Sequence, residues 1–285
     1  MSTAAAMTES QTESPLGIIA GSGELPRQLV EACLKNGRNF FIVGIENETS
    51  AAILENAPHV VIRLGAIGMA FEHLHHHGVE ELVLAGKINR PSISGLVPDK
   101  MGAKLLSRLG LSLFGGDAKI FKTIIVFLEE EGFRVIGIED ILKDFISPEG
   151  PLGRQIPDKQ SQSDIELGVH VVREIGALDI GQAVIVKNGL VLGIEAAEGT
   201  DALIVRCGEL RGEGKGGVLV KARKPIQEER VDLPTIGPKT MELLHKSGFS
   251  GVAVESKHSL IVDRKEVIRM ADALGLFIIG FSLHE

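Results

Sequence analysis

The segment KARKPIQEERVDLPTIGPKT, residues 221–240, gathers the residue types that chemistry on an anionic ligand requires. Lys221 and Lys224 offer positive charge to an anion, and Asp232 could bind a hard cation or orient a water molecule. Three prolines in this segment fix backbone angles and remove amide donors, so we expect rigid bends here. The pattern indicates a binding site, although a solvated charged loop would have the same composition.

A second group of polar residues lies in EAAEGTDALI, where Glu198, Thr200 and Asp201 surround a glycine turn. Clustered carboxylates at such a turn can bind a cation or handle protons. Thr200 or Asp201 would serve equally well as the N-cap of the helix that follows, since the helix dipole favours acids there. The two interpretations are compatible, and the sequence does not decide between them.

Two further candidate segments lie in the N-terminal half. Gly21-Ser22-Gly23, in IIAGSGELP, follows an apolar strand pattern and precedes a helical one, so its amides could bind phosphate. Pro26 stands where the dinucleotide fingerprint has its third glycine, so we do not expect NAD binding. A tight turn without a ligand would use the same glycines.

The segment LAGKINRP places Lys87, Asn89 and Arg90 after another predicted strand. Because ligands of open α/β sheets bind beyond the carboxyl ends of the strands, we expect these residues on the same rim as the glycine turn. Alternatively, they are polar groups that only cap the sheet.

The histidines at 73, 75, 76 and 77 resemble a metal cluster, but no glutamate or cysteine nearby completes a ligand set. An exposed polar helix face is the better interpretation.

Short apolar runs that alternate with amphipathic stretches predict the elements that must position these residues. The predicted N-terminal strands lie near residues 16–20, 39–44, 59–63, 81–85 and 133–136. In the second half, two apolar runs around Asn188-Gly189 predict a hairpin. The fold class is therefore α/β, with an N-terminal Rossmann-like parallel sheet flanked by helices and a C-terminal mixed α/β domain.

The expected organisation is a disordered tail over residues 1–14, a Rossmann-like domain over 15–147, a Pro- and Gly-rich linker over 148–163 and a catalytic domain over 164–285. A net charge of −8 argues against nonspecific nucleic-acid binding. We find neither a secretory signal nor an apolar run of about 20 residues that could span a bilayer. Cys33 and Cys207 are expected to be buried free thiols in a reducing cytosol.

Together, AGSGELP, GKINRP, GGDA, EAAEGTDALI and the K-x-x-K-P-x-Q-x-x-R-x-D-L-P-T-I-G motif resemble the UDP-2,3-diacylglucosamine pyrophosphatase family of lipid A biosynthesis, in the branch unrelated to calcineurin-like phosphoesterases. The resemblance extends from about Leu16 to the C-terminus. Where the family commonly has Gly-Asp-Asp, this chain has Gly116-Asp117-Ala118.

The resemblance implies hydrolysis of UDP-2,3-diacylglucosamine to UMP and 2,3-diacylglucosamine 1-phosphate, with Mg²⁺ or Mn²⁺ as cofactor. It also implies a lipid-sugar cleft between two domains, a homodimer, and a cytoplasmic protein in peripheral contact with the inner membrane. Asp232 matches the essential acid of the family, and we expect Glu198 or Asp201 to help it bind the metal. The expected catalytic residues are Asp232, Lys221 and Lys224, and the expected substrate-binding residues are Gly21, Ser22, Gly23, Leu25, Lys87, Asn89, Arg90, Asp117, Thr200, Gln227 and Thr235.

Two other functions stay open from the residues alone. A nonenzymatic nucleotide-sugar sensor would need the basic residues but not Asp232, so the acids of the last motif favour an enzyme. A hydrolase of a soluble sugar nucleotide would use the same acids without an apolar site for acyl chains.

Overall fold

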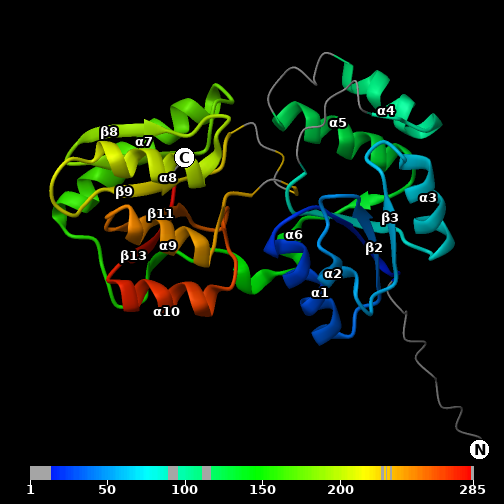
Figure 1. The fold of residues 1–285 in the computed structure, drawn as a ribbon, viewed down its shortest axis with the longest axis horizontal. Coiled ribbons are helices and arrows are strands. Elements are labelled where there is room, and N and C mark those ends of the chain that lie inside the picture. The colour runs from blue at the N-terminus through cyan, green and yellow to red at the C-terminus, as the bar shows by residue number, and fades with distance from the viewer. Residues whose placement is uncertain are drawn as a thin grey trace, which may run out of the picture. The chain divides into compact units, whose positions relative to one another are not determined.

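A computed structural model describes residues 14–88, 96–110, 117–225, 228, 230–231 and 233–283 (Figure 1). The chain forms two compact units. The N-terminal unit contains the chain up to Lys104 together with Leu128–Ile136, and the C-terminal unit contains Leu105–Phe127 and the chain from Gly137 onward.

The N-terminal unit is built on a five-stranded sheet of order β3-β2-β1-β4-β5, in which all neighbouring strands are parallel. Its strands are β1 (Leu16–Ala20), β2 (Phe40–Ile45), β3 (His59–Ile62), β4 (Glu81–Ala85) and β5 (Arg134–Val135). All residues of β2, FFIVGI, are buried, as expected for an inner strand covered on both faces. The sequence prediction of five strands in a Rossmann-like sheet is confirmed.

Helices connect these strands: α1 (Glu24–Asn36), α2 (Ala51–Leu54) and α3 (Ile67–His76) belong to the N-terminal unit, and α4 (Lys100–Leu109) and α5 (Asp117–Glu130) cross the division between the units. The helix α1 buries Leu29 and Cys33 and ends at Gly37, whose φ of 66° is left-handed. The strand order reverses at β1, which lies between β2 and β4. The carboxyl ends of β1 and β4 are therefore where an open α/β sheet binds ligands.

Asp99 joins the starts of two of these helices. Its Oδ2 atom accepts hydrogen bonds from the amides of Gly68 at 2.6 Å and Met69 at 3.3 Å, in the first turn of α3. Its Oδ1 atom accepts one from the amide of Gly102 at 2.8 Å, in the first turn of α4. One carboxylate thus satisfies donors that both helices would otherwise leave unpaired.

The C-terminal unit contains a mixed six-stranded sheet of order β6-β13-β11-β9-β7-β8 and a separate parallel pair of β10 (Thr235–Ile236) and β12 (Leu260–Ile261). Strands β9, β11 and β13 are parallel, whereas β6, β7 and β8 pair antiparallel. The six strands are β6 (Gly150–Leu152), β7 (Ala183–Lys187), β8 (Leu190–Ile194), β9 (Val218–Lys221), β11 (Gly251–Glu255) and β13 (Phe277–Phe281).

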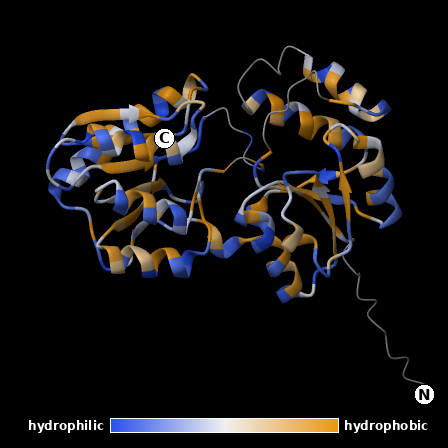
Figure 2. Cartoon of the chain, viewed as in Figure 1, coloured by the Kyte–Doolittle hydropathy of each residue, from blue (hydrophilic) through white to orange (hydrophobic). Residues whose placement is uncertain are grey.

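Helices cover both faces of this sheet. On one face, α7 (Lys159–Ala177) packs Val172 and Ile175 against Val184 and Val220 of the sheet. On the other face lie α8 (Gly199–Leu210), α9 (Pro238–Lys246) and α10 (Arg264–Leu274), which share a second apolar core with the sheet. In Figure 2 the strands of this unit are mainly hydrophobic, whereas the helices carry both hydrophobic and hydrophilic residues. The short α6 (Ile138–Ile141) and the 3-10 helix η3 (Lys143–Phe145) precede this domain core.

Part of the segment 148–163, expected as a linker, belongs to the sheet. Gly150 and Pro151 lie in β6, which pairs antiparallel with β13 at the edge of the sheet. An edge strand tolerates proline because its outer side needs no amide donor. The side chain of Asp158 then accepts a hydrogen bond from the amide of Ser161 at 2.7 Å, so α7 begins at Lys159, earlier than the expected Asp164.

The predicted hairpin is confirmed at Asn188 and Gly189, which have φ angles of 52° and 76°. Asp164, on α7, is buried and accepts hydrogen bonds from both turn amides, at 2.9 Å from Asn188 and 2.7 Å from Gly189. This carboxylate fixes the turn from the neighbouring helix.

Candidate functional site

The candidate site of the C-terminal unit lies at the carboxyl end of β9, where Lys221 is only 5% exposed. Its ammonium donates to the hydroxyl of Thr200 at 2.9 Å and to the backbone carbonyl of Thr235 at 3.2 Å. The three residues come from β9, α8 and β10. The structure therefore brings together three of the residues that the sequence predicted for the site.

Behind Thr200 lies Glu195, which directly follows β8 and is 6% exposed. Its Oε1 atom accepts the Thr200 hydroxyl at 2.7 Å, and its Oε2 atom accepts the amide of Gln182 at 3.2 Å. Thr200 therefore does not cap α8: the N-cap is Glu198, and its side chain makes no capping bond. Sequence reasoning gave Glu195 no role, because its connection to Lys221 exists only in the folded sheet.

Lys224, three residues beyond Lys221, is 8% exposed and lies 2.8 Å from Oδ1 of Asp179. Asp179 follows α7 and adopts a left-handed φ of 57°. A Cβ atom on Gly176, in the last turn of α7, would lie 3.3 Å from Cα of Lys224, so the helix end and this lysine are in close contact. Each of the two buried lysines is thus held by a partner from a different element.

The neighbouring strand β11 ends at Glu255, which is buried and accepts a hydrogen bond from the amide of Arg223 at 2.8 Å. Burial lowers the pKa of the nearby His258, and the positive charges of Arg223 and Lys257 lower it further, against an opposite effect of Glu255. Since β9 and β11 are parallel neighbours, these groups share one edge of the sheet with Lys221.

The two described acids of the expected metal set are already engaged. Glu198 accepts from Arg206 at 2.7 Å and from the amide of Ala196 at 3.1 Å, and the bond from Arg206 lowers the pKa of its carboxyl. Asp201 forms an exposed ion pair with Lys239 at 2.7 Å. Within the described ranges, no three His, Cys, Asp or Glu side chains are grouped so that they could hold a metal ion. These acids do not fit a preassembled cation site.

Several predicted residues cannot be placed in this geometry. Asp232, Gln227, Asn89 and Arg90 lie outside the described residues. Asp117 is the first described residue of α5, and its side chain is also outside the description. The hydroxyl of Thr235 donates to the carbonyl of Leu233 at 2.9 Å, so Thr235 faces Lys221 through its backbone carbonyl.

In the N-terminal unit, the Gly21 turn and Lys87 lie together at the carboxyl ends of β1 and β4, as predicted. The amide of Ser22 donates to the carbonyl of Lys87 at 2.8 Å, and the amide of Lys87 donates back to Ser22 at 3.0 Å. The Ser22 hydroxyl also donates to the Lys87 carbonyl, and the amide of Gly21 donates to Ala85. The amides of Gly21 and Ser22 therefore join the two loops, and phosphate binding by this turn stays a prediction.

Among the described residues of this rim, the amides of the first turn of α1 could bind a ligand, because helix geometry leaves them without intrahelical partners. This turn includes Leu25 and follows Gly23, which has a φ of 100°. The side chain of Lys87 is exposed beside it. In its described part, the rim thus combines the ammonium of Lys87 with the N-terminus of α1.

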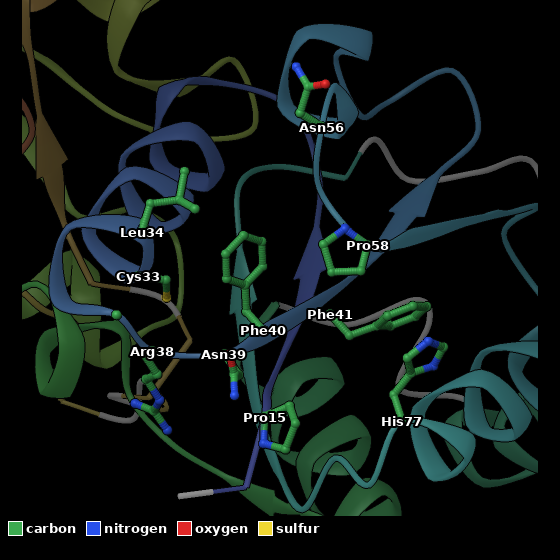
Figure 3. A pocket seen from close by; sticks show the side chains of 11 residues that line it. Pro15, Cys33, Leu34, Arg38, Asn39, Phe40, Phe41, Asn56, Pro58 and His77 are labelled. Carbon is green, nitrogen blue, oxygen red and sulfur yellow. The ribbon is translucent and has the colours of Figure 1, made fainter. Parts of the chain in front are cut away.

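A pocket of about 370 Å³ lies at the opposite edge of the same sheet (Figure 3). Pro15, Phe40 and Pro58, which line it, stand at the amino ends of β1, β2 and β3. Phe41 in this pocket stacks on His77, with 4.0 Å between ring centroids. The residues predicted for the site do not line this pocket, which is lined by Pro15, Cys33, Leu34, Gly37, Arg38, Asn39, Phe40, Phe41, Asn56, Pro58 and His77.

Other expectations from the sequence agree with the structure. His75, His76 and His77 are exposed, and His75 stacks on Phe133. Cys33 and Cys207 are free and buried, and burial raises the pKa of both thiols. None of the described helices is both long and apolar enough to cross a bilayer.

Both parts of the chain match known protein domains. Residues 15–145 match a family described as the LpxI N-terminal domain, and residues 148–279 match the LpxI C-terminal domain. UDP-2,3-diacylglucosamine pyrophosphatase LpxI of Caulobacter vibrioides is 39% identical over 276 residues, which cover 95% of this chain and 98% of that protein. Among solved structures, CobK precorrin-6A reductase covers 96% of this chain and 89% of its own at 10% identity and a TM-score of 0.34. The match to an isoflavone reductase covers 96% of this chain and 80% of the reductase, at 12% identity and a TM-score of 0.29.

Proposed function

This chain belongs to the LpxI family, and on that premise we propose that it hydrolyses the diphosphate bond of UDP-2,3-diacylglucosamine in lipid A biosynthesis. One water molecule is consumed, one P–O bond of the diphosphate is broken, and the products are UMP and 2,3-diacylglucosamine 1-phosphate. The observation that carries this proposal is the 39% identity over nearly the whole length of a relative that is named for this activity.

The two buried lysines supply the positive charge that this reaction needs. A diphosphate presents several negative oxygens, and in the transition state of hydrolysis negative charge is spread over the phosphoryl oxygens and develops on the leaving oxygen. Lys221 and Lys224 are held by Thr200 and Asp179 before any ligand arrives. Preorganised charge in a site that excludes water stabilises the transition state without a cost of reorganisation.

We propose that a divalent cation, Mg²⁺ or Mn²⁺, takes part, and Asp232 is the acid to test first as its ligand. Glu198 and Asp201 are weaker candidates because they already pair with Arg206 and Lys239. When bound, such a cation would neutralise diphosphate charge and thereby make phosphorus more accessible to water.

The N-terminal rim offers a second anion-binding surface. Lys87 and the first-turn amides of α1, including that of Leu25, could bind phosphate or uridine oxygens of the substrate. The two acyl chains of this substrate require contact with a membrane surface, and we propose peripheral contact with the cytoplasmic face of the inner membrane. We also propose a homodimer, which light scattering on the purified chain would test.

The deciding experiment measures UMP release from UDP-2,3-diacylglucosamine and from UDP-glucosamine without acyl chains, each with Mg²⁺, with Mn²⁺ and with EDTA. We expect release only from the acylated substrate, lost in EDTA and restored by excess Mg²⁺. Equal turnover of both substrates would identify a soluble sugar-nucleotide hydrolase instead. Tight binding without UMP release would identify a sensor, and full activity in EDTA would remove the cation from the reaction.

A further inference from the structure

Glu195 is a buried carboxylate whose two oxygens are both used within the C-terminal unit. One oxygen accepts the Thr200 hydroxyl at 2.7 Å and the other accepts the Gln182 amide at 3.2 Å. Its backbone is equally fixed, because its amide donates to the carbonyl of Ala183 at 2.8 Å. The backbone of Gly181 packs directly against that of Glu195, because a Cβ atom on Gly181 would lie only 2.0 Å from the Glu195 carbonyl oxygen. Glu195 is thus an acceptor held in place by its neighbours in the C-terminal unit.

The chemistry of the three groups sets the direction of the hydrogen bonds. A carboxylate can only accept, so the Thr200 hydroxyl must donate its hydrogen to Glu195. The lone pairs of the same hydroxyl oxygen are then available to Lys221, whose ammonium can only donate and lies 2.9 Å away. A negative carboxylate thus polarises the hydroxyl that accepts from the positive ammonium, and each bond strengthens the other.

We propose that Glu195, acting through Thr200, is a positioning residue that fixes the ammonium of Lys221 for the diphosphate. The inference rests on the proposed function, since it explains how one of its cations is oriented. A lysine side chain is long and flexible, so holding it in one conformation costs entropy. Its charge stabilises a transition state best when the side chain is already in place. The carbonyl of Thr235 provides the second fixed acceptor at 3.2 Å, so the ammonium is held from two elements.

Thr200→Val tests this role because valine has nearly the same shape and lacks the hydroxyl. We expect kcat for UMP release to fall on the order of 10- to 100-fold with a smaller change in KM, as for a catalytic group that is misplaced. Thr200→Ser keeps the hydroxyl and should restore most of the activity. Glu195→Gln should resemble Thr200→Val, because an amide cannot accept from both Thr200 and Gln182.

A double-mutant cycle separates positioning from a general structural role. In a Lys221→Met background, Thr200→Val and Glu195→Gln should cause no further loss of kcat, since the group on which they act is gone. Asp164→Asn is the matched control: Asp164 is another buried carboxylate of the same unit, and its partners among the described residues are the hairpin amides and the side chain of Gln160. It should lower thermal stability and leave kcat near the wild-type value.

A measurement without turnover makes the test independent of the proposed function. Lysine ammonium groups give ¹H–¹⁵N NMR signals when hydrogen bonds hold them in place, and Lys221→Met assigns the signal of Lys221. Lys187 is an internal reference, because its ammonium donates to the carbonyls of Arg211, Glu213 and Gly214 at 2.9, 2.9 and 3.2 Å. Thr200→Val and Glu195→Gln should remove or shift the Lys221 signal and leave that of Lys187 unchanged.

The outcomes are distinct. A Thr200→Val variant that keeps both the Lys221 signal and the wild-type kcat would overturn the inference, as would additive losses in the Lys221→Met background. A wild-type protein that shows a held Lys221 signal, lost in Thr200→Val, but releases no UMP would overturn the proposed function while supporting the positioning of Lys221.

Discussion

The ammonium of Lys224 lies 2.8 Å from the carboxylate of Asp179, although 45 residues separate them in the chain. Both side chains are largely buried, at 10% and 17% exposed. Removing one member of such a pair leaves the other charge with little solvent to replace its partner. The contact therefore supports both the stability of the C-terminal unit and the placement of a candidate catalytic cation.

Asp179→Asn isolates the charge of this pair, because asparagine tolerates the left-handed φ of 57° at this position. We expect the free energy of unfolding to fall by roughly 2 kcal/mol, measured by urea denaturation. Lys239→Gln is a useful control, since it breaks an exposed ion pair with Asp201 and should change stability little. Equal stability of Asp179→Asn and wild type would show that Lys224 does not depend on this carboxylate.

Much of the fold follows from local sequence patterns. The structure confirms the strands near residues 16–20 and 81–85 and the hairpin at Asn188-Gly189. These elements could be predicted because apolar runs and turn residues within a short stretch of sequence determine them. The segment 148–163 differs because its role depends on a distant partner: β6 pairs with β13, and nothing local distinguishes such an edge strand from a Pro-rich linker.

The same limit applies to the candidate site. Charge within one motif predicted Lys221 and Lys224, but the groups that hold them, Glu195 and Asp179, come from other elements. The hydrogen bond from the Ser22 amide to the Lys87 carbonyl likewise depends on the pairing of β1 with β4, which no local pattern around Ser22 reports. Both Glu195 and Asp179 are acidic residues that come soon after the end of a strand or helix. That position is the signal in the sequence that could have identified them.

Asp232→Ala tests the acid that the sequence motif singles out. We expect turnover of UDP-2,3-diacylglucosamine to fall at least about 100-fold, the usual loss when a group that stabilises transition-state charge is removed. Circular dichroism and the melting temperature should remain close to wild type. A folded variant with normal turnover would remove Asp232 from the mechanism.

The pKa of His258 predicts how stability depends on pH. Burial and the positive charges of Arg223 and Lys257 lower this pKa in the folded state, whereas Glu255 opposes them. The unfolded chain, with a histidine pKa of about 6.5, therefore binds more protons than the folded protein below that pH. The contribution of the neutral His258 ring to the free energy of unfolding is complete above about pH 6.5. It is lost as the pH falls through the lower pKa of the folded state.

His258→Gln removes this titration. Urea denaturation of wild type and variant at a series of pH values from neutral down to mildly acidic should show a smaller decrease in stability for the variant. Parallel curves for the two proteins would mean that His258 titrates alike in the folded and unfolded states.

Gly21→Ala tests the close contact between the two loops of the N-terminal rim. A Cβ atom on Gly21 would lie 2.4 Å from the carbonyl oxygen of Lys87, and backbone cannot move aside as a flexible side chain would. We expect the loops to separate, with a loss of stability of about 1–3 kcal/mol and a higher KM because Lys87 is displaced. Ser22→Ala is the matched comparison: it removes one hydroxyl bond to Lys87 but keeps the backbone bonds, so its effect on both quantities should be smaller. If Gly21→Ala had the melting temperature and KM of wild type, the rim would not require this close approach and Lys87 would not be fixed by it.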